Sequence, residues 1–453
     1  MKIIIVGAGK VGYQLAKNLL SEGNDITVID KNELVVNTAG NTLDCIGLTG
    51  NGAAYSTLLD AGVANNDLLI ATTASDEINI ITCLTAKHLG IKNTIARVRN
   101  PEYYEKTGFL QNTIGASMLI NPEFSTAGEI ARILRLPSAT KVELFAGGKA
   151  ELISYKVKPG SPIEGITLSD FNRSTGIKVL ICAAERGGNV MIPSGDFIPR
   201  ADDILYVIGA PQDMVNTLKK INVYSNRAKT VMIAGGGKIA FYLTEMLVKS
   251  GVKVKLIEKD RKKAEELAAF LPKAVVLVGD VSDHELLLEE GLEKTDAFIA
   301  LTGLDEGNIL AALYASQHNV RKVIAKVNND DLVSLMRGTA LDSVVSPKHL
   351  TVNYISRYVR ALAEGENAES VEAVYKLSGG KAEVLEFTAE GENAPYLNTP
   401  LMDLRLKKSV LIACIVRKGR AIIPGGQDSI LKNDKLLVVT ADKQLRSLKD
   451  IME

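Results

Sequence analysis

The sequence predicts an α/β protein made by tandem duplication, with two doubly wound parallel sheets that are each followed by a small α+β domain. Three observations predict this fold. Short apolar runs alternate with stretches of helical periodicity, one glycine-rich turn occurs twice, and each such region gives way to short alternating strands. A chain of 453 residues has room for several domains.

The first glycine-rich turn lies near the start of the chain. Residues Ile3–Val6 form a short apolar run typical of a buried parallel strand, and Gly7, Gly9 and Gly12 follow as G-x-G-x-x-G. Gly7 allows the tight turn, Gly9 lets the backbone approach a pyrophosphate, and Gly12 lets the next helix pack close to the strand. The N-terminus of that helix offers free N–H groups to phosphate. The pattern indicates a Rossmann-like dinucleotide-binding unit.

An acid stands where such a unit needs one. The second strand, Ile26–Ile29, runs directly into Asp30. A carboxylate at this strand end can accept both ribose hydroxyls of an adenine nucleotide. It also favours NAD over NADP, because it would repel a 2′-phosphate.

The same landmarks return in the second half of the chain. Gly235 repeats Gly7 at an offset of 228 residues, and Glu258 repeats Asp30 at the same offset. Other pairs at this offset are Val11/Ile239, Leu15/Leu243, Leu19/Leu247 and Gly23/Gly251. Farther along, the offset becomes 229, and the matched pairs are Ala71/Ala300, Thr73/Thr302, Asp76/Asp305, Glu77/Glu306, Asn79/Asn308 and Ala96/Ala325.

The repeat predicts four domains, two nucleotide-binding and two small. Their expected bounds are 1–136, 137–222, 229–362 and 366–453. Amphipathic helices opening at Asn121-Pro122 and Ser346-Pro347 are expected to join each large domain to its small one. Their apolar stripes either pack on another subunit or remain within their own chain. The stripe residues are Ile130, Ile133, Leu134, Ile355, Val359 and Leu362.

Composition excludes several function classes. Lys plus Arg equals Asp plus Glu at 53 each, and no helix-turn-helix pattern is evident, which argues against a DNA-binding repressor. The four cysteines lack C-x-x-C spacing and are expected to be reduced thiols, three of them buried. The four histidines show no metal-ligand spacing. No signal peptide is expected, and no apolar run approaches the roughly 20 residues that span a bilayer.

No catalytic constellation accompanies the nucleotide motifs. A dehydrogenase needs a proton donor or acceptor near the nicotinamide, but His88 and His318 are expected at helix ends and His284 in a solvated helix start. We therefore expect no catalytic residues. An NAD-dependent oxidoreductase remains the alternative, and steady turnover of NADH with a small acid or alcohol would support it.

In order, these motifs closely resemble the regulatory subunit of Trk-type potassium uptake, the TrkA family, over essentially the whole chain. That family joins two tandem units, each an RCK N-terminal domain followed by an RCK C-terminal domain. The motifs are KIIIVGAGKVG (2–12), NDITVID (24–30), TTASDE (72–77), IARVR (95–99), IPSGD (192–196), GGGKIA (235–240), VKLIE (254–258) and VGDVSD (278–283).

The resemblance implies a cytoplasmic protein, peripheral on the inner face of the cell membrane, that binds NAD(H), with ATP or ADP as further candidates. It implies a homo-oligomeric ring, a tetramer of tandem chains, beneath a potassium-translocating membrane subunit of the TrkH/TrkG type, with no nucleic acid partner. The ligand would gate that partner by shifting a conformational equilibrium, with the joining helices as hinges.

The expected binding residues follow from the motifs and the resemblance. In the first copy they are Gly7, Ala8, Gly9, Lys10, Val11, Gly12, Asp30, Gly50, Asn51, Thr73, Ala74 and Arg97. In the second copy they are Gly235, Gly236, Gly237, Lys238, Ile239, Glu258, Gly279, Asp280, Thr302, Gly303 and Lys326.

The two copies are not equal. Glu258 is one methylene longer than Asp30, and Lys326 lacks the bidentate fork of Arg97. We expect the first copy to be the better match to NAD(H), and the second ligand stays open between another nucleotide and none.

Overall fold

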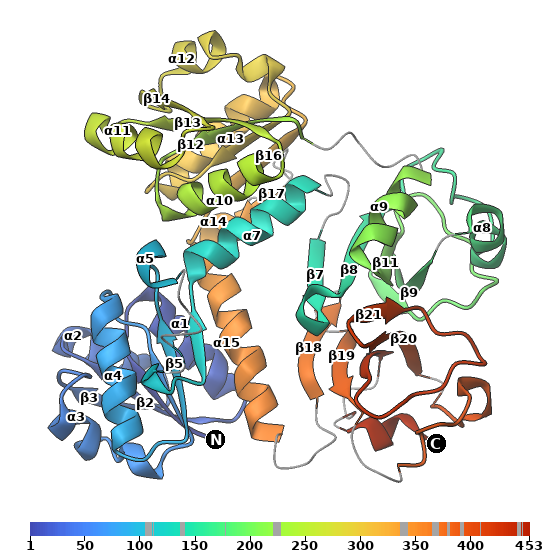
Figure 1. Ribbon diagram of the computed structural model, residues 1–453, viewed down its shortest axis with the longest axis horizontal. Coiled ribbons are helices and arrows are strands. Elements are labelled where there is room, and N and C mark those ends of the chain that lie inside the picture. Colours follow the sequence, from blue (N-terminus) through green and yellow to red (C-terminus); the bar gives the residue numbers. More distant parts are fainter. Residues whose placement is uncertain are drawn as a thin grey trace. The chain divides into compact units, whose positions relative to one another are not determined.

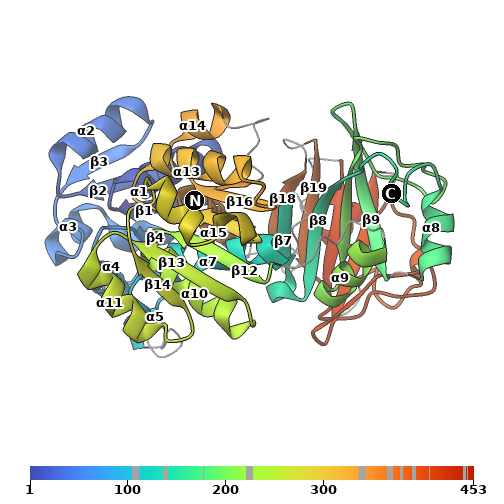
Figure 2. The ribbon, with the colours of Figure 1, turned by 90° about the horizontal axis from the view of Figure 1, so that it is seen from above.

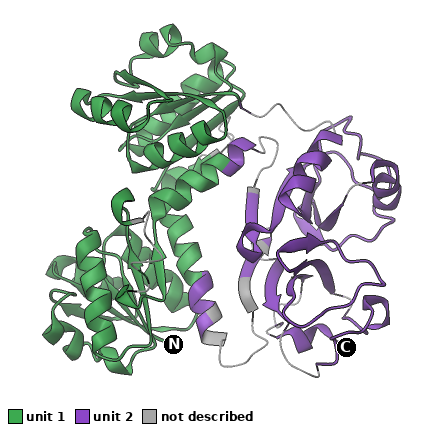
Figure 3. Ribbon diagram, viewed as in Figure 1, with its two compact units in different colours: residues 1–131, 229–356 green, residues 132–228, 357–453 purple. Residues whose placement is uncertain are grey.

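The protein is described here by a computed structural model. The described residues are 1–104, 111, 113–135, 141–176, 178–220, 228–335, 343–364, 371–377, 381–389, 394–407, 409–441, 445 and 447–453. They form two compact units (Figure 3). Unit 1 comprises Met1–Ala131 and Lys229–Ser356, and unit 2 comprises Arg132–Ala228 and Arg357–Glu453.

Unit 1 holds two six-stranded sheets of the same topology. The first has the order β3-β2-β1-β4-β5-β6, with every neighbouring pair parallel. The central strand β1 is apolar because helices cover both faces, and Ile3, Ile4 and Ile5 are fully buried. The elements are β1 (Lys2–Val6), α1 (Lys10–Ser21), β2 (Asp25–Asp30), α2 (Glu33–Thr42), β3 (Ile46–Thr49), α3 (Tyr55–Asp60), β4 (Leu68–Ala71), α4 (Asp76–His88), β5 (Asn93–Arg97), α5 (Pro101–Tyr104) and β6 (Met118–Ile120).

The second sheet, β14-β13-β12-β15-β16-β17, is also parallel throughout. Its strand order confirms the predicted duplication of a Rossmann-like sheet. The elements are β12 (Thr230–Ala234), α10 (Lys238–Lys249), β13 (Lys253–Glu258), α11 (Arg261–Phe270), β14 (Val275–Val278), α12 (His284–Glu289), β15 (Ala297–Ala300), α13 (Asp305–Gln317), β16 (Lys322–Lys326), α14 (Asp330–Leu335) and β17 (Ser343–Val345).

The two copies in unit 1 exchange helices. Helix α7 (Pro122–Arg135), which follows the first sheet, begins against α10 of the second copy, and α15 (Pro347–Glu364), which follows the second sheet, packs beside α1 of the first (Figures 1 and 2). The Asn121 amide donates to the Tyr242 hydroxyl at 3.0 Å, and the ring of Phe124 meets that of Tyr242 edge-on at 5.4 Å. On the other side, the Asn18 amide donates to the Ser356 hydroxyl at 2.8 Å.

Five of the six predicted stripe residues of these helices are buried within this chain, and Leu362 is half-buried. Ile130 and Ile355 are fully buried, and Ile133, Leu134 and Val359 are almost so. Packing on another subunit is therefore not needed to cover them, and the alternative of packing within the chain describes the structure. The boundary between the two units falls inside both helices, after Ala131 and after Ser356.

Unit 2 holds two antiparallel sheets, β10-β9-β11-β8-β7 and β18-β19-β22-β20-β21. Each carries one buried acid that holds an arginine and the N–H of a neighbouring turn: Asp203 with Arg186, and Asp434 with Arg417. The elements are β7 (Lys141–Phe145), β8 (Ala150–Lys156), α8 (Leu168–Thr175), β9 (Val179–Arg186), β10 (Asn189–Met191), β11 (Ile204–Gly209), α9 (Pro211–Lys220), β18 (Val371–Leu377), β19 (Ala382–Thr388), β20 (Val410–Arg417), β21 (Arg420–Ile422) and β22 (Lys435–Thr440).

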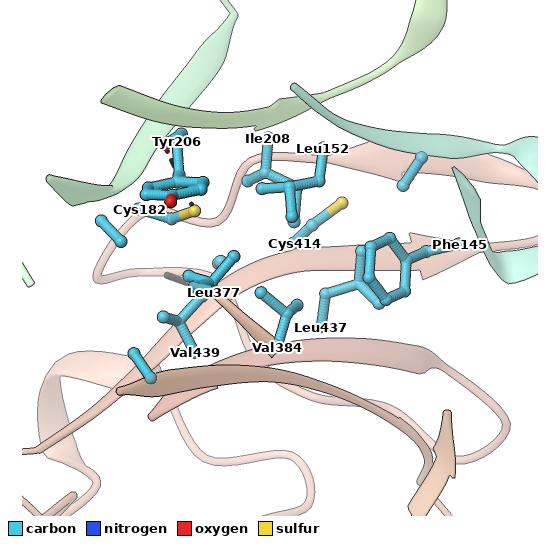
Figure 4. Packing of buried hydrophobic residues seen from close by; sticks show 14 of the residues in the cluster. Phe145, Leu152, Cys182, Tyr206, Ile208, Leu377, Val384, Cys414, Leu437 and Val439 are labelled. Atoms are coloured by element: carbon cyan, nitrogen blue, oxygen red, sulfur yellow. Dashed lines mark hydrogen bonds between the residues drawn. The ribbon is translucent and has the colours of Figure 1, made fainter. Parts of the chain in front are cut away.

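The two antiparallel sheets share one apolar core (Figure 4). Phe145, Leu152 and Ile208 come from the first sheet, and Val384 and Leu437 from the second. Two buried thiols, Cys182 and Cys414, lie in the same core; burial raises the pKa of each to about 12. Both cysteines are free, as are Cys45 and Cys83.

The predicted domain ends at 136, 137, 222 and 366 lie outside the described residues. The four-domain boundaries therefore remain a prediction. Within the part of the chain that the structure describes, no helix is long and apolar enough to cross a membrane.

Candidate functional site

The predicted binding residues of the first copy gather at the carboxyl ends of the strands. The N–H of Gly7 donates to the carbonyl of Ile29 at 2.8 Å, and the N–H of Gly50 donates to that of Asp30 at 2.9 Å. The N–H of Thr72 donates to the Val6 carbonyl at 2.7 Å. These bonds continue the sheet beyond its strands, so the turns after β1, β2, β3 and β4 lie side by side. This edge is where open parallel sheets bind ligands.

The glycine turn is shaped by close backbone approaches. Gly7 has φ of +95°, and a Cβ there would lie 2.8 Å from the backbone nitrogen of Thr73. A Cβ on Gly12 would lie 1.8 Å from the Gly7 carbonyl oxygen, so the helix could not start where it does. Gly9 caps α1 without any side-chain bond, and the space around its Cα is open. The first N–H groups of α1 are thus free to meet an anion.

Asp30 reaches back under this turn. One of its oxygens accepts the N–H of Ala8 at 2.7 Å, and the other accepts the N–H of Asn32 at 2.9 Å. The two bonds fix the carboxylate beside the glycine turn. Each oxygen retains a free acceptor position, since a carboxylate offers about four in total.

A buried asparagine that sequence reasoning did not assign to the site holds the turn after β4. Asn79, fully buried in α4, accepts from both the N–H and the hydroxyl of Thr73, at 2.8 and 2.7 Å. Its amide nitrogen donates to the Arg97 carbonyl at 2.9 Å. The Arg97 guanidinium donates to the Thr73 carbonyl at 2.6 Å. The turns after β4 and β5 are therefore joined through one side chain.

Asp76 makes a second such link. One of its oxygens accepts the N–H groups of Arg99 and Asn100, both at 2.7 Å. In the second copy Asp305 accepts the N–H groups of Asn328 and Asn329 at 2.8 and 2.9 Å. A signal for these residues was present in the sequence, because a polar residue kept in both copies of a repeat has a common task.

The second copy reproduces the geometry of the first. Gly235 has φ of +97°, and its N–H donates to the Ile257 carbonyl at 2.8 Å. The Gly279 N–H donates to the Glu258 carbonyl at 3.0 Å. Asn308 holds the N–H and hydroxyl of Thr302 at 2.8 and 2.7 Å, and the Lys326 ammonium donates to the Thr302 carbonyl at 2.6 Å.

The acids of the two copies differ in their surroundings. Glu258 is 7% exposed and accepts the N–H of Gly236 at 2.9 Å and that of Asp260 at 3.0 Å. It also accepts the ammonium of Lys263 at 2.8 Å. Burial by itself would raise the pKa of Glu258, but the hydrogen bonds from Lys263, Asp260 and Gly236 outweigh burial and lower it. Asp30 has no such ammonium partner among the described residues.

The remaining predicted residues lie around these edges. Lys10 and Lys238 begin α1 and α10, and Val11 and Ile239 follow them. The Asn51 side chain accepts the N–H of Ala53, and that of Asp280 accepts the N–H and hydroxyl of Ser282, so both shape their own turns. The Ala74 carbonyl accepts from Arg99, and Gly303 follows Thr302 with open space at its Cα.

Glu123, at the start of α7, links the edges of the two copies electrostatically. Burial raises the pKa of Glu123 and outweighs both a backbone hydrogen bond and the charges of Arg99, Arg97 and Lys238, which lower it. Its charge acts in turn on Lys326, whose pKa burial lowers. Exchange of α7 therefore brings a residue of the first copy near the second glycine turn. No group of three potential metal ligands occurs in the described part of the chain.

The glycine turns differ at one position, which is Ala8 in the first copy and Gly236 in the second, and the neighbouring side chains differ accordingly. A Cβ on Gly236 would lie 2.5 Å from a methyl of Leu267 and 2.9 Å from a Glu258 carboxylate oxygen. In the first copy the equivalent positions are Ala39 and Asp30, whose side chains are both shorter, and the loop residue there is Ala8.

We predict that Gly236→Ala destabilises the second copy by about 1–2 kcal/mol, since Leu267 and Glu258 must shift to admit the methyl. Ala8→Gly is the matched control and should cost less than about 1 kcal/mol. Urea unfolding of both variants measures the difference. Equal stability of Gly236→Ala and the unmodified chain would contradict the packing argument.

Comparison with known proteins decides the family. The model of the TrkA-N domain matches residues 3–122 and 231–347, and that of the TrkA-C domain matches residues 152–222 and 389–453. The chain belongs to the TrkA family. It is 34% identical to the Trk system potassium uptake protein TrkA homolog of Archaeoglobus fulgidus, over the whole of both chains. It is also 34% identical to TrkA of Haemophilus influenzae, over 98% of this chain and 96% of that one.

Solved structures with a similar fold include the GsuK channel and the GsuK RCK domain. The chain superposes on the GsuK channel bound to NAD with a TM-score of 0.64 and 19% identity, over 98% of this chain and 77% of that one. For the GsuK RCK domain the TM-score is also 0.64, over 93% of that chain. This likeness confirms the predicted fold, and the family models place a TrkA-N domain before a TrkA-C domain twice along the chain. As TrkA relatives are potassium-uptake proteins, the chain is not an oxidoreductase.

Proposed function

We propose that this TrkA chain is a cytoplasmic, nucleotide-sensing regulatory subunit that gates a membrane potassium transporter. One observation carries the proposal: a glycine turn, free helix N–H groups and a strand-end acid are assembled twice in unit 1. This set of groups recognises the pyrophosphate and ribose of an adenine nucleotide. Relatives named Trk potassium-uptake proteins, and a similar channel solved with NAD, support the link to potassium transport.

NAD(H) is the proposed ligand of the first site, with Gly7–Gly12 at the pyrophosphate and Asp30 at the ribose. ATP or ADP is a further candidate, and GsuK, which has a similar fold, has been solved bound to ADP. A ligand acts only through its difference in affinity between two conformations, typically about 1–3 kcal/mol per site. The proposed hinges are α7 and α15, because the unit boundary runs through both.

We propose further that chains assemble as a ring, a tetramer, on the inner face of the membrane against a potassium-translocating subunit of the TrkH/TrkG type. A ring would add the coupling of several sites. About 5.5 kcal/mol is enough to move a two-state gate from 1:99 to 99:1.

Ligand-dependent stability tests the first step. We expect at least one of NAD, NADH, ADP and ATP to raise the melting temperature of the full chain, since a ligand at 100 times its Kd stabilises the native state by about 2.7 kcal/mol. The double variant Asp30→Ala/Glu258→Ala should show a smaller shift, because both strand-end acids are removed while the glycine turns remain. If none of the four shifts the transition at millimolar concentration, the sensor proposal fails.

Potassium flux tests the second step. The full chain is reconstituted with its membrane partner in vesicles, and ion uptake is measured against nucleotide. Flux that changes with nucleotide only when the chain is present supports gating. Flux that is the same with and without the chain at every nucleotide concentration would refute it.

A further inference from the structure

The carboxylate of the second copy is already occupied by a residue of its own helix. Asp30 accepts two hydrogen bonds from the chain, one on each oxygen, and both donors are backbone N–H groups. Glu258 accepts the two equivalent N–H bonds and, in addition, the Lys263 ammonium on the oxygen that faces Gly236. With about four acceptor positions per carboxylate, Asp30 has two left and Glu258 has one.

Two free positions are what a ribose diol requires. The 2′- and 3′-hydroxyls of an adenosine each donate one hydrogen bond, and an acid at this strand end receives both. Glu258 can receive only one while Lys263 stays in place. The Lys263–Glu258 pair lies at a partly buried carboxylate: the side chain of Glu258 is 8% exposed and that of Lys263 is 46% exposed.

Only the second copy has a lysine at this position of the helix. The residue equivalent to Lys263 in the first copy is Val35, which has no charge to offer Asp30. Both residues lie in the first turn of the helix after the acid-bearing strand, in α11 and α2. Both helices have a capping side chain: Asn32 accepts the N–H of Leu34 in α2, and Asp260 accepts the N–H of Lys263 in α11.

We propose that Lys263 is a specificity-determining residue that makes the second site depend less than the first on the ribose hydroxyls of its adenine nucleotide. This inference rests on the proposed nucleotide function of both copies. It means that the two sites answer to different features of the ligand: the first to an intact ribose diol, the second mainly to pyrophosphate at its glycine turn. A chain with both sites then fills them at different nucleotide concentrations.

The test compares ADP with 2′-deoxy-ADP, because the two probes carry the same phosphates. The affinity for ADP divided by the affinity for 2′-deoxy-ADP reports ribose recognition alone. The electrostatic effect of removing a lysine is the same for both probes and cancels in this ratio. The full chain carrying Asp30→Ala lacks the ribose acid of the first site, so a preference for the intact ribose that remains in this background comes from the second site. We expect a ratio near one in that background, and a ratio about tenfold higher after Lys263→Val is added, when Glu258 is free to accept both hydroxyls.

Two control variants test whether Lys263 acts by occupying an acceptor position of Glu258 or in some other way. Lys263→Arg keeps a cation beside Glu258, so the ratio should stay near one. Lys262→Val removes an exposed lysine one position earlier in the same helix and should leave the ratio unchanged.

Three outcomes would overturn the proposal. In the first, the ratio does not rise after Lys263→Val, and in the second it is already high with Lys263 present. In the third, the Asp30→Ala chain binds no ADP, either with Lys263 or after Lys263→Val. The failure of the proposed function looks different. In that case the unmodified chain binds neither ADP nor NAD at its first site, and no ratio can be measured in any variant.

Discussion

Replacing Asn79 by leucine should lower the free energy of unfolding of unit 1 by about 2–4 kcal/mol. Leucine fits the volume but removes the bonds to two backbone groups, the N–H of Thr73 and the carbonyl of Arg97. The Thr73 hydroxyl also loses its bond to Asn79 and keeps only the one to the Ser75 carbonyl at 3.2 Å. Asn79 is fully buried, so water cannot replace these bonds without opening the helix. Each unsatisfied buried group costs about 1–3 kcal/mol, partly relieved by relaxation of the turn.

Urea unfolding of the full chain measures this loss, with hydrogen exchange of the β4 and β5 amides to assign it to unit 1. Asn37→Leu is the matched control, because Asn37 lies exposed in α2 and the same substitution there should change stability by less than about 0.5 kcal/mol. Asn308→Leu should behave like Asn79→Leu. If Asn79→Leu unfolds no more readily than Asn37→Leu, the side chain does not hold the two turns together.

Removal of the Asp30 carboxylate should weaken nucleotide binding at the first site by about 10- to 100-fold. A hydrogen bond to a charged group contributes about 1.5–3 kcal/mol, and tenfold in affinity corresponds to 1.4 kcal/mol. Asp30→Ala also frees the N–H groups of Ala8 and Asn32, which hold the loop beside the glycine turn. The loss therefore combines ribose recognition with a looser site.

Isothermal titration with NAD and ADP gives the affinities. Asp25→Ala is the control, since Asp25 lies exposed at the other end of the same strand and removes the same charge. Affinity should be unaffected by Asp25→Ala. Equal affinities of the Asp30→Ala chain and the unmodified chain for both nucleotides would mean that the ribose does not bind at this strand end.

The sequence was sufficient for the fold class because its strongest signals are local. The Gly7–Gly12 turn requires glycine for backbone reasons, and its copy at Gly235 lies at a constant offset, so the duplicated parallel sheet could be predicted and is confirmed. The helices after Asn121 and Ser346 were expected for the same reason. Their exchange between copies was not, because an amphipathic stripe shows that a surface is covered without showing which surface covers it.

The contacts that fix the site were harder to predict. Asn79 lies in an apolar helix, and only its repetition at Asn308 marked it; its partners on β4 and β5 depend on the fold. Lys263 belongs to a basic run that is typical of a solvated helix face, and its bond to Glu258 spans five residues from a strand to a helix. Pairing across such a turn depends on geometry that composition does not encode.

Helix exchange within one chain has a consequence for how such a molecule can diverge. In a homodimer every substitution appears on both sides of the two-fold axis, so an isologous interface must tolerate each change twice. Here the two sides are separate stretches of one gene. Asn121 contacts Tyr242, but the equivalent positions in the other copy hold Ser346 and Gln14. Asn18 contacts Ser356, and there the equivalent positions hold Met246 and Ala131. Because the two copies lie in one chain, this interface need not be symmetric, and each side has contacts that the other lacks.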